Sequence, residues 1–301
     1  MVQLHLPLWP LMEIVVEVDG VTGQERLDAA LAALAADDAS FSVYRDQESG
    51  LTVMAGMTED QLDAKASLLL NRYNLAVSFG APQVAYRETI TSAVKIEGAS
   101  DEHDGIDCQS ARVGILFEPG EQGSGFVFKS LIAADLADTA VIAAVHDGIE
   151  SARHLGLLAG FPAIAFEATL IEATGSGLGL TMKSFEFAAR HAFGQLRTKG
   201  APVLLEPVMT INVVTPEAFI GDVLGDLNLR RGLFTATGSR PNGLSLTADV
   251  PLSNLFGYKN TLDHISDGRA SFTMAFSHYD RVPQIPGPPD DLYPPAIGMR
   301  A

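Results

Sequence analysis

The chain has 301 residues, 47% of them hydrophobic and 19% charged, and a formal net charge of −17. This composition excludes a disordered chain, and the length predicts two or three domains that each bury a core. The single cysteine, Cys108, excludes an internal disulfide framework and is expected to be a free thiol. The sequence has no uninterrupted apolar stretch of about 18 residues and no secretory signal, which predicts a cytoplasmic protein.

The N-terminal segment is predicted to be one compact α+β unit. Leu27, Leu31 and Leu34 recur with helical spacing, and Thr58 with Gln61 has the spacing of a capping box at the start of a second helix. Short strands are expected around the turn signal between the helices. The expected elements are a strand at 10–16, a helix at 24–36, strands at 41–45 and 51–55, a helix at 59–71 and a strand at 75–79.

The middle segment has a different pattern, with an acidic loop after its first strand and a Gly-rich loop before its last helix. Tyr86, Arg87 and Glu88 lie in the first strand, where a structural role at the domain junction is favoured over direct RNA contact. The expected elements are strands at 84–96 and 111–117, a helix at 138–155, a strand at 164–171 and a helix at 184–197.

The last segment repeats the order of the first. Thr215, Pro216 and Glu217 supply an N-cap, a proline at the first helical position and an acid in the first turn. A hairpin turn is expected at 241–243. The expected elements are a strand at 207–213, a helix ending at 229, strands at 232–237 and 244–250, a helix at 252–265 and a strand at 270–278.

Both end segments have the order of a split βαβ unit, with helices on one face of an antiparallel sheet. The fold class is therefore α+β, with two ferredoxin-like domains on either side of an α/β domain. The domain boundaries predicted are 1–80, 81–206 and 207–283, followed by a Pro-rich, extended tail at 284–301.

Four segments resemble the C-terminal half of translation elongation factor G; they are Gly80–Ile90, Gly221–Gly232, Pro251–Tyr258 and Asp267–Tyr279. Because they occur in the family's order, the resemblance extends from Leu11 to Pro283. It implies the family's domains three to five, with a fourth domain of the ribosomal protein S5 domain 2-like type. Members of this family are GTPases that move tRNA and mRNA through the ribosome, and the resemblance implies a GTPase domain upstream of this part.

The sequence has no phosphate-binding loop of the Gly-x-x-x-x-Gly-Lys-Ser/Thr type. Gly125 and Gly179 precede Lys129 and Lys183 by only four residues, which is the wrong spacing. GTP hydrolysis also needs a magnesium-holding acid and a water-positioning residue around such a loop. We therefore expect no enzyme activity and no cofactor in this chain, because GTP and magnesium would belong to the GTPase domain.

In the family, two loops at the tip of the fourth domain hold the tRNA–mRNA duplex at the decoding centre. The corresponding segments here, 97–107 and 172–184, depart from the family pattern: the first has five acids and no Lys or Arg, and the second lacks the family's His and Asp. An acidic loop near rRNA loses counterion release and adds repulsion. The tip residues singled out are Asp101, Glu102, His103, Asp104, Gly175, Gly177 and Gly179.

These tip segments also have readings unrelated to the family. The acids around His103 resemble an oxygen-rich metal site but lack the pattern of a calcium loop, so a solvated loop is favoured. Gly175, Gly177 and Gly179 resemble a dinucleotide fingerprint in which the third glycine is one place early. A flexible loop is therefore favoured over a small-molecule enzyme.

The basic residues expected to face the ribosome or RNA are Lys183, Arg230, Arg231 and Arg269. Arg230 and Arg231 have an alternative role at the C-terminus of a helix, where basic side chains interact favourably with the helix dipole. The leading functional hypothesis is the ribosome-engaging part of an elongation factor G-like protein, with rRNA and ribosomal proteins as partners and neither membrane nor DNA. The alternative is a divergent paralogue that binds a protein partner.

Overall fold

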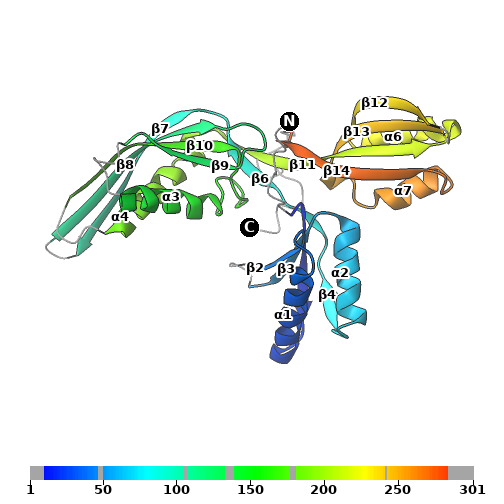
Figure 1. The fold of residues 1–301 in the computed structure, drawn as a ribbon, viewed down its shortest axis with the longest axis horizontal. Helices are drawn as coiled ribbons and strands as arrows, with labels where there is room; N and C mark the ends of the chain where they lie inside the picture. The colour runs from blue at the N-terminus through cyan, green and yellow to red at the C-terminus, as the bar shows by residue number, and fades with distance from the viewer. Residues whose placement is uncertain are drawn as a thin grey trace, which may run out of the picture. The chain divides into compact units, whose positions relative to one another are not determined.

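A computed structural model of the chain describes residues 10–46, 50–104, 107–132, 139–176, 181–240 and 243–283. Their contacts divide them into two compact units (Figure 1). The first comprises the described residues of Met1–Ala85 and Glu206–His278, and the second those of Tyr86–Leu205 and Tyr279–Ala301. The fold is mixed α+β, as predicted. The tail at 284–301 lies outside the described residues.

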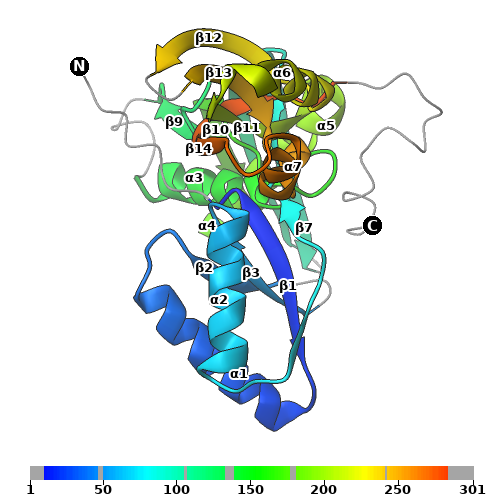
Figure 2. The same ribbon diagram turned by 90° about the vertical axis from the view of Figure 1, so that its right-hand side faces the viewer.

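The N-terminal module has the predicted ferredoxin-like topology. Its sheet has the order β2-β3-β1-β4, with β1 antiparallel to both of its neighbours, and β5 also pairs with β1. The three leucines that predicted the first helix are all buried in it, and α2 lies across β3 in the view of Figure 2. The elements are β1 Met12–Val18, α1 Val21–Ala36, β2 Ser42–Arg45, β3 Thr52–Gly56, α2 Glu59–Asn71, β4 Val77–Phe79 and β5 Gln83–Val84.

The predicted cap of α2 is present, with one difference. The Thr58 hydroxyl accepts a hydrogen bond from the Gln61 backbone N–H at 3.2 Å. The Gln61 side-chain oxygen accepts a hydrogen bond from the Met57 N–H at 2.7 Å. Met57 is one residue before the N-cap, whereas in a standard capping box this side chain bonds the N–H of the N-cap residue itself. Both bonds satisfy donors that the start of the helix would otherwise leave unpaired.

A polar cluster joins the end of α1 to α2. One oxygen of Asp38 accepts from the Ser40 N–H and hydroxyl, and the other accepts from the Gln61 amide at 3.0 Å and from Lys65 at 3.1 Å. Hydrogen bonds from Ser40, Gln61 and Lys65 hold the pKa of the Asp38 carboxyl well below its usual range. These bonds stabilise the ionised carboxylate in the folded state.

Asp38→Asn is expected to lose a pH-dependent part of the stability. Because the folded pKa is depressed, this contribution is complete above the unfolded pKa of about 3.9 and is lost as pH falls below that value toward the folded pKa. Urea unfolding should therefore show a gap between the wild type and Asp38→Asn at about pH 6 that shrinks at about pH 3. The neighbouring exposed Asp37→Asn is the control and should show no such gap. A gap independent of pH would contradict this assignment.

The C-terminal module repeats the topology. Its sheet has the order β12-β13-β11-β14, and β6 of the second unit also pairs with β11. The predicted hairpin pairs from Leu233↔Asp249 to Arg240↔Gly243, although its turn residues 241 and 242 lie outside the described residues. The elements are β11 Pro202–Thr215, η1 Glu217–Phe219, α6 Ile220–Leu229, β12 Leu233–Arg240, β13 Gly243–Pro251, η2 Leu252–Asn254, α7 Tyr258–Ile265 and β14 Ser271–Arg281.

Two helix predictions in this module need correction. Thr215 is not an N-cap: it is the last residue of β11, its hydroxyl donates to the Pro216 carbonyl, and the chain enters α6 through the 3-10 turn η1. The helix predicted at 252–265 is divided into η2 and α7. Gly257 separates them with a φ of 64°, a left-handed conformation that does not continue a helix.

Tyr258→Phe is expected to leave the stability unchanged or raise it. The ring is 2% exposed and packs edge-on against Phe272, yet its hydroxyl is the one buried side-chain polar atom of the described residues that has no hydrogen-bond partner. A buried hydroxyl without a hydrogen-bond partner lowers the stability of the fold by about 1–3 kcal/mol. Because the Tyr258 hydroxyl makes no hydrogen bond, its removal breaks none. Thermal unfolding checks this, and Tyr258→Leu, which removes the ring, should be clearly destabilised.

The second unit contains one four-stranded sheet of order β7-β8-β10-β9, in which β9 runs parallel to β10 and the other pairs are antiparallel. The helices α3 and α4 lie side by side on one face of this sheet (Figure 1). Phe117, Phe166 and Phe193 meet in the core between them. The elements are β6 Arg87–Ile90, β7 Val94–Asp104, β8 Asp107–Pro119, β9 Phe126–Ser130, α3 Thr139–Arg153, β10 Phe166–Ser176, α4 Met182–Gly194 and α5 Leu196–Lys199.

Three predictions for the second unit need correction. The strand expected at 84–96 is three separate strands, β5, β6 and β7, because β5 pairs with β1 and β6 pairs with β11. The acidic segment is not a loop, since β7 continues to Asp104 and pairs with β8 from Asp107 onward. The helix expected at 184–197 begins earlier and is divided into α4 and α5 by Gln195.

Candidate functional site

The sheet of the second unit brings the two segments of interest to one end. The strand β8 lies between β7 and β10, so residues from both segments align across it. In one row across β7, β8 and β10, Ala111 pairs with both Ser100 and Gly175. In the next row, Ser110 pairs with both Asp101 and Ser176. The β7–β8 hairpin then continues past the end of β10, to the pair Asp104↔Asp107. We call this end of the sheet, residues 97–114 of the hairpin with 172–176 of β10, the tip.

The helix α4 supports the tip from the core side. An added Cβ at Gly98 would lie 2.0 Å from the Ala188 carbonyl oxygen, so strand and helix are in direct backbone contact there. The His191 Nδ1 lies 3.0 Å from the Ala99 carbonyl oxygen, and the Gln195 amide donates to the Glu97 carbonyl at 2.9 Å. The same helix follows β10, the strand that carries the second tip segment. It therefore holds both tip segments in a fixed position relative to each other.

On the opposite face of the tip, the side chains that the structure describes carry mixed charge. Glu97, Arg112 and Glu172 are all exposed, and the register places Glu97 and Glu172 on either side of Gly114. Arg112 occupies the next outward row, between Ala99 and Thr174. Sequence analysis did not single out Arg112, although it is the first basic residue after the acidic segment. Its outward position follows from strand alternation once the register is known.

The predicted tip residues fall on strands or outside the described part. The backbone of Asp101, Glu102, His103 and Asp104 belongs to β7. Gly175 lies in β10 and pairs with Ala111, so it is not part of a loop, whereas Gly177 and Gly179 are not among the described residues. No group of three or more His, Cys, Asp or Glu residues in the described part of the chain is arranged to hold a metal ion.

Arg230, which follows α6, is engaged within its own module. Its guanidinium bonds Asp226 at 2.7 Å, the Asn254 carbonyl at 2.6 Å and the Thr261 hydroxyl at 3.0 Å, and it lies over the Tyr258 ring. Its side chain is only 17% exposed. This geometry supports the structural alternative considered for Arg230.

The other three basic residues are more accessible. Arg231 pairs with the buried Glu206 at 2.7 Å and keeps 44% of its side chain exposed. Arg269 pairs with Asp267 at 3.2 Å and covers the Phe219 ring. Lys183 is exposed in the first turn of α4, near the end of the second tip segment at 172–184. Lys183 belongs to the second unit and both arginines belong to the first.

Glu88 is the strongest structural feature that local sequence pattern did not reveal. Its carboxylate is fully buried and accepts backbone hydrogen bonds from Leu157, Leu158, Ala159 and Phe161. Its own N–H and carbonyl bond Pro162 and Ile164. This arrangement confirms the structural role expected for Glu88, and it fixes the loop between α3 and β10.

Comparison with known proteins identifies the family. Three family descriptions match in consecutive order: "Elongation Factor G, domain III" at residues 9–81, "Elongation factor G, domain IV" at 82–200 and "Elongation factor G C-terminus" at 203–287. The chain belongs to the elongation factor G family. The tip described above lies within the match to domain IV.

Similar proteins agree with this assignment. Elongation factor G of Hyphomonas neptunium is 44% identical over 275 residues, which cover 91% of this chain and 39% of that protein. A crystal structure of a protein from Thermus thermophilus superposes with a TM-score of 0.73 at 30% identity, covering 97% of this chain and 43% of the other. The chain thus corresponds to about two fifths of an elongation factor G, the part that matches domain III, domain IV and the C-terminus. The family's process is translation, and none of the helices in the described ranges is long and apolar enough to cross a membrane.

Proposed function

We propose that this chain is the ribosome-engaging portion of an elongation factor G-like translation factor. The observation that carries the proposal is the consecutive series of family matches between residues 9 and 287, in the order of domains III, IV and C-terminus. A scaffold alone does not confer an activity, so the proposal also depends on surface chemistry. Its cationic contacts would include Lys183, Arg231 and Arg269, which keep exposed side chains.

Ribosome binding is tested by co-sedimentation with purified ribosomes at increasing salt. A plot of the logarithm of the binding constant against the logarithm of the salt concentration has a negative slope. Removing one cation that neutralises a phosphate should make this slope shallower by about 0.7–0.9. We expect Lys183→Glu and Arg269→Glu to weaken co-sedimentation. Arg45→Glu is the matched control, because Arg45 is 56% exposed and Arg269 is 59% exposed, and only Arg269 is in the proposed set. No co-sedimentation at low salt would overturn the proposal.

We further propose that this chain does not hydrolyse GTP by itself and needs no cofactor. The support is the lack of a Gly-x-x-x-x-Gly-Lys-Ser/Thr motif in the sequence together with matches to non-GTPase domains. GTP and magnesium would then bind a GTPase domain outside the matched residues. The purified chain should release no phosphate from GTP, with or without ribosomes, and release above background would refute this.

The tip supports a second candidate, a family member that binds a protein partner in place of RNA. Residues 97–107 have five acids and no Lys or Arg, and the net charge of the chain is −17. Negative charge near rRNA reduces affinity. Pull-down from lysate with and without RNase separates the two candidates, because an RNA-dependent interaction disappears on digestion and a protein interaction remains.

A further inference from the structure

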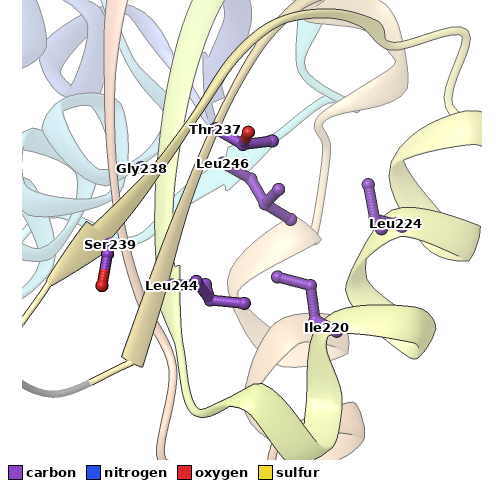
Figure 3. Close-up of a pocket in the computed structure, with 7 residues that line it drawn as sticks. All are labelled: Ile220, Leu224, Thr237, Gly238, Ser239, Leu244 and Leu246. Carbon is purple, nitrogen blue, oxygen red and sulfur yellow. The ribbon is translucent and has the colours of Figure 1, made fainter.

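An apolar groove lies beside the edge strand of the C-terminal module. It is lined by Ile220 and Leu224 of α6, by Leu244 and Leu246 of β13, and by Thr237, Gly238 and Ser239 of β12. Figure 3 shows Ile220 and Leu224 reaching from α6 toward the two leucines of β13. The groove holds about 360 Å³, enough for several apolar side chains.

The groove exists because β12 has small residues where a core strand would have large ones. Thr237 is opposite Leu246 and Ser239 is opposite Leu244, so all four side chains share the face that α6 covers. Leu246 is buried, but Thr237 and Ser239 remain exposed. The helix therefore covers β13 and leaves the outer edge of the face open.

The backbone of β12 is also open on its outer side. This strand ends the sheet order, and its only charged residue in eight is Arg240. Leu233, 70% exposed, and Phe234, 37% exposed, extend the apolar surface along it. A bulge between Phe234 and Ala236 interrupts the register, which leaves Ala236–Arg240 as the regular edge. Exposed uncharged edges pair with added strands unless something blocks them, and here neither proline nor an inward charge does.

We propose that Ala236–Arg240 and the adjoining groove bind an extended peptide segment of a partner protein by strand addition. A strand paired with β12 would point alternate side chains toward Ile220 and Leu224, so the groove selects apolar residues at alternate positions. The chain has a net charge of −17, and the exposed acids Glu217 and Asp222 are close in sequence to the groove residue Ile220. They favour Lys or Arg at the ends of the peptide and disfavour Asp or Glu. This inference does not depend on ribosome binding.

The probe for the test is a fluorescein-labelled peptide, Lys-Val-Thr-Val-Thr-Val-Lys, titrated with the full chain and followed by fluorescence anisotropy. We expect saturable binding. Two comparison peptides should bind at least tenfold more weakly: Lys-Val-Pro-Val-Pro-Val-Lys, which lacks two backbone donors, and Glu-Val-Thr-Val-Thr-Val-Glu, which has the opposite charge.

Two variants of the chain locate the site. Thr237→Trp fills the groove and should weaken binding at least tenfold. Ala236→Trp is the matched control, because Ala236 is exposed on the same strand but is opposite Thr247, on the other face of the sheet, and it should keep the affinity. Circular dichroism confirms that both variants fold.

Three outcomes would overturn the proposal. The first is no binding of the basic peptide, and the second is equal affinity for the basic and proline peptides or for the two tryptophan variants. The third is a dimer in analytical ultracentrifugation that Thr237→Trp dissociates, because the occupant of the edge would then be a second copy of this chain.

Discussion

Replacing Glu88 with glutamine is expected to destabilise the second unit by at least about 1–3 kcal/mol. One carboxylate oxygen accepts from the N–H groups of Leu157 and Leu158, and the other accepts from those of Ala159 and Phe161. A glutamine amide can present only one acceptor oxygen. Whichever way it turns, one buried donor, from Leu157 or Phe161, and one part-buried donor face an NH2 group. An unpaired buried donor costs about 1–3 kcal/mol, and a part-buried one costs less.

The loop that Glu88 holds is also fixed by contacts other than those of the carboxylate. Gly156 precedes it with a φ of 72°, and a Cβ there would lie 2.5 Å from the Phe161 carbonyl oxygen. Arg197 donates to the Leu157 carbonyl at 2.9 Å, so the opposite side of the loop is also fixed. These contacts limit how far the loop can move, so the penalty is expected to fall mainly on the buried donors of Leu157 and Phe161.

Hydrogen exchange of the β10 amides and urea unfolding by circular dichroism measure the effect of Glu88→Gln. Glu172→Gln is the matched control, since Glu172 is exposed in β10 of the same unit. The control is expected to change the free energy of unfolding by less than about 0.5 kcal/mol. Equal stability of the two variants would show that the carboxylate is not needed by the loop.

The two ferredoxin-like modules were predictable because their signals are local. The leucines of α1 repeat every three or four residues, and the cap at Thr58 involves a residue three positions away. The strands β5, β6 and β7 were merged in the prediction because nothing local separates them. What separates them is pairing with distant strands, such as Arg87–Ile90 with Pro202–Leu205.

The candidate site was only partly predictable for the same reason. The acidic composition of 97–107 suggested a solvated loop, since acidic residues are depleted in strands, but pairing with β8 outweighs that preference. The donors to Glu88 lie 69–73 residues away in the sequence, so no local pattern marks this side chain. Likewise, the choice between the two roles of Arg230 depended on Asn254 and Thr261, which are 24 and 31 residues away.

Gly98→Ala should destabilise the tip by about 1–3 kcal/mol or more, because overpacking at a rigid contact forces backbone movement. The new Cβ would lie 2.0 Å from the Ala188 carbonyl oxygen and 2.8 Å from the Ala192 Cβ. The first of these atoms belongs to the helix backbone, so no side-chain rotation relieves the overlap. The helix α4 must move away from β7, which lengthens the bonds from His191 and Gln195 to the strand.

Gly194→Ala is the control for this variant, because it makes the same chemical change in the last residue of α4, where an added Cβ meets nothing within 4 Å. It is expected to be neutral or to stabilise the helix by up to about 1 kcal/mol. Urea unfolding and hydrogen exchange of the amides at 97–99 compare the two variants. If Gly98→Ala matches Gly194→Ala in both measurements, α4 is not seated on β7 at this contact. The two tip segments would then lack this common support.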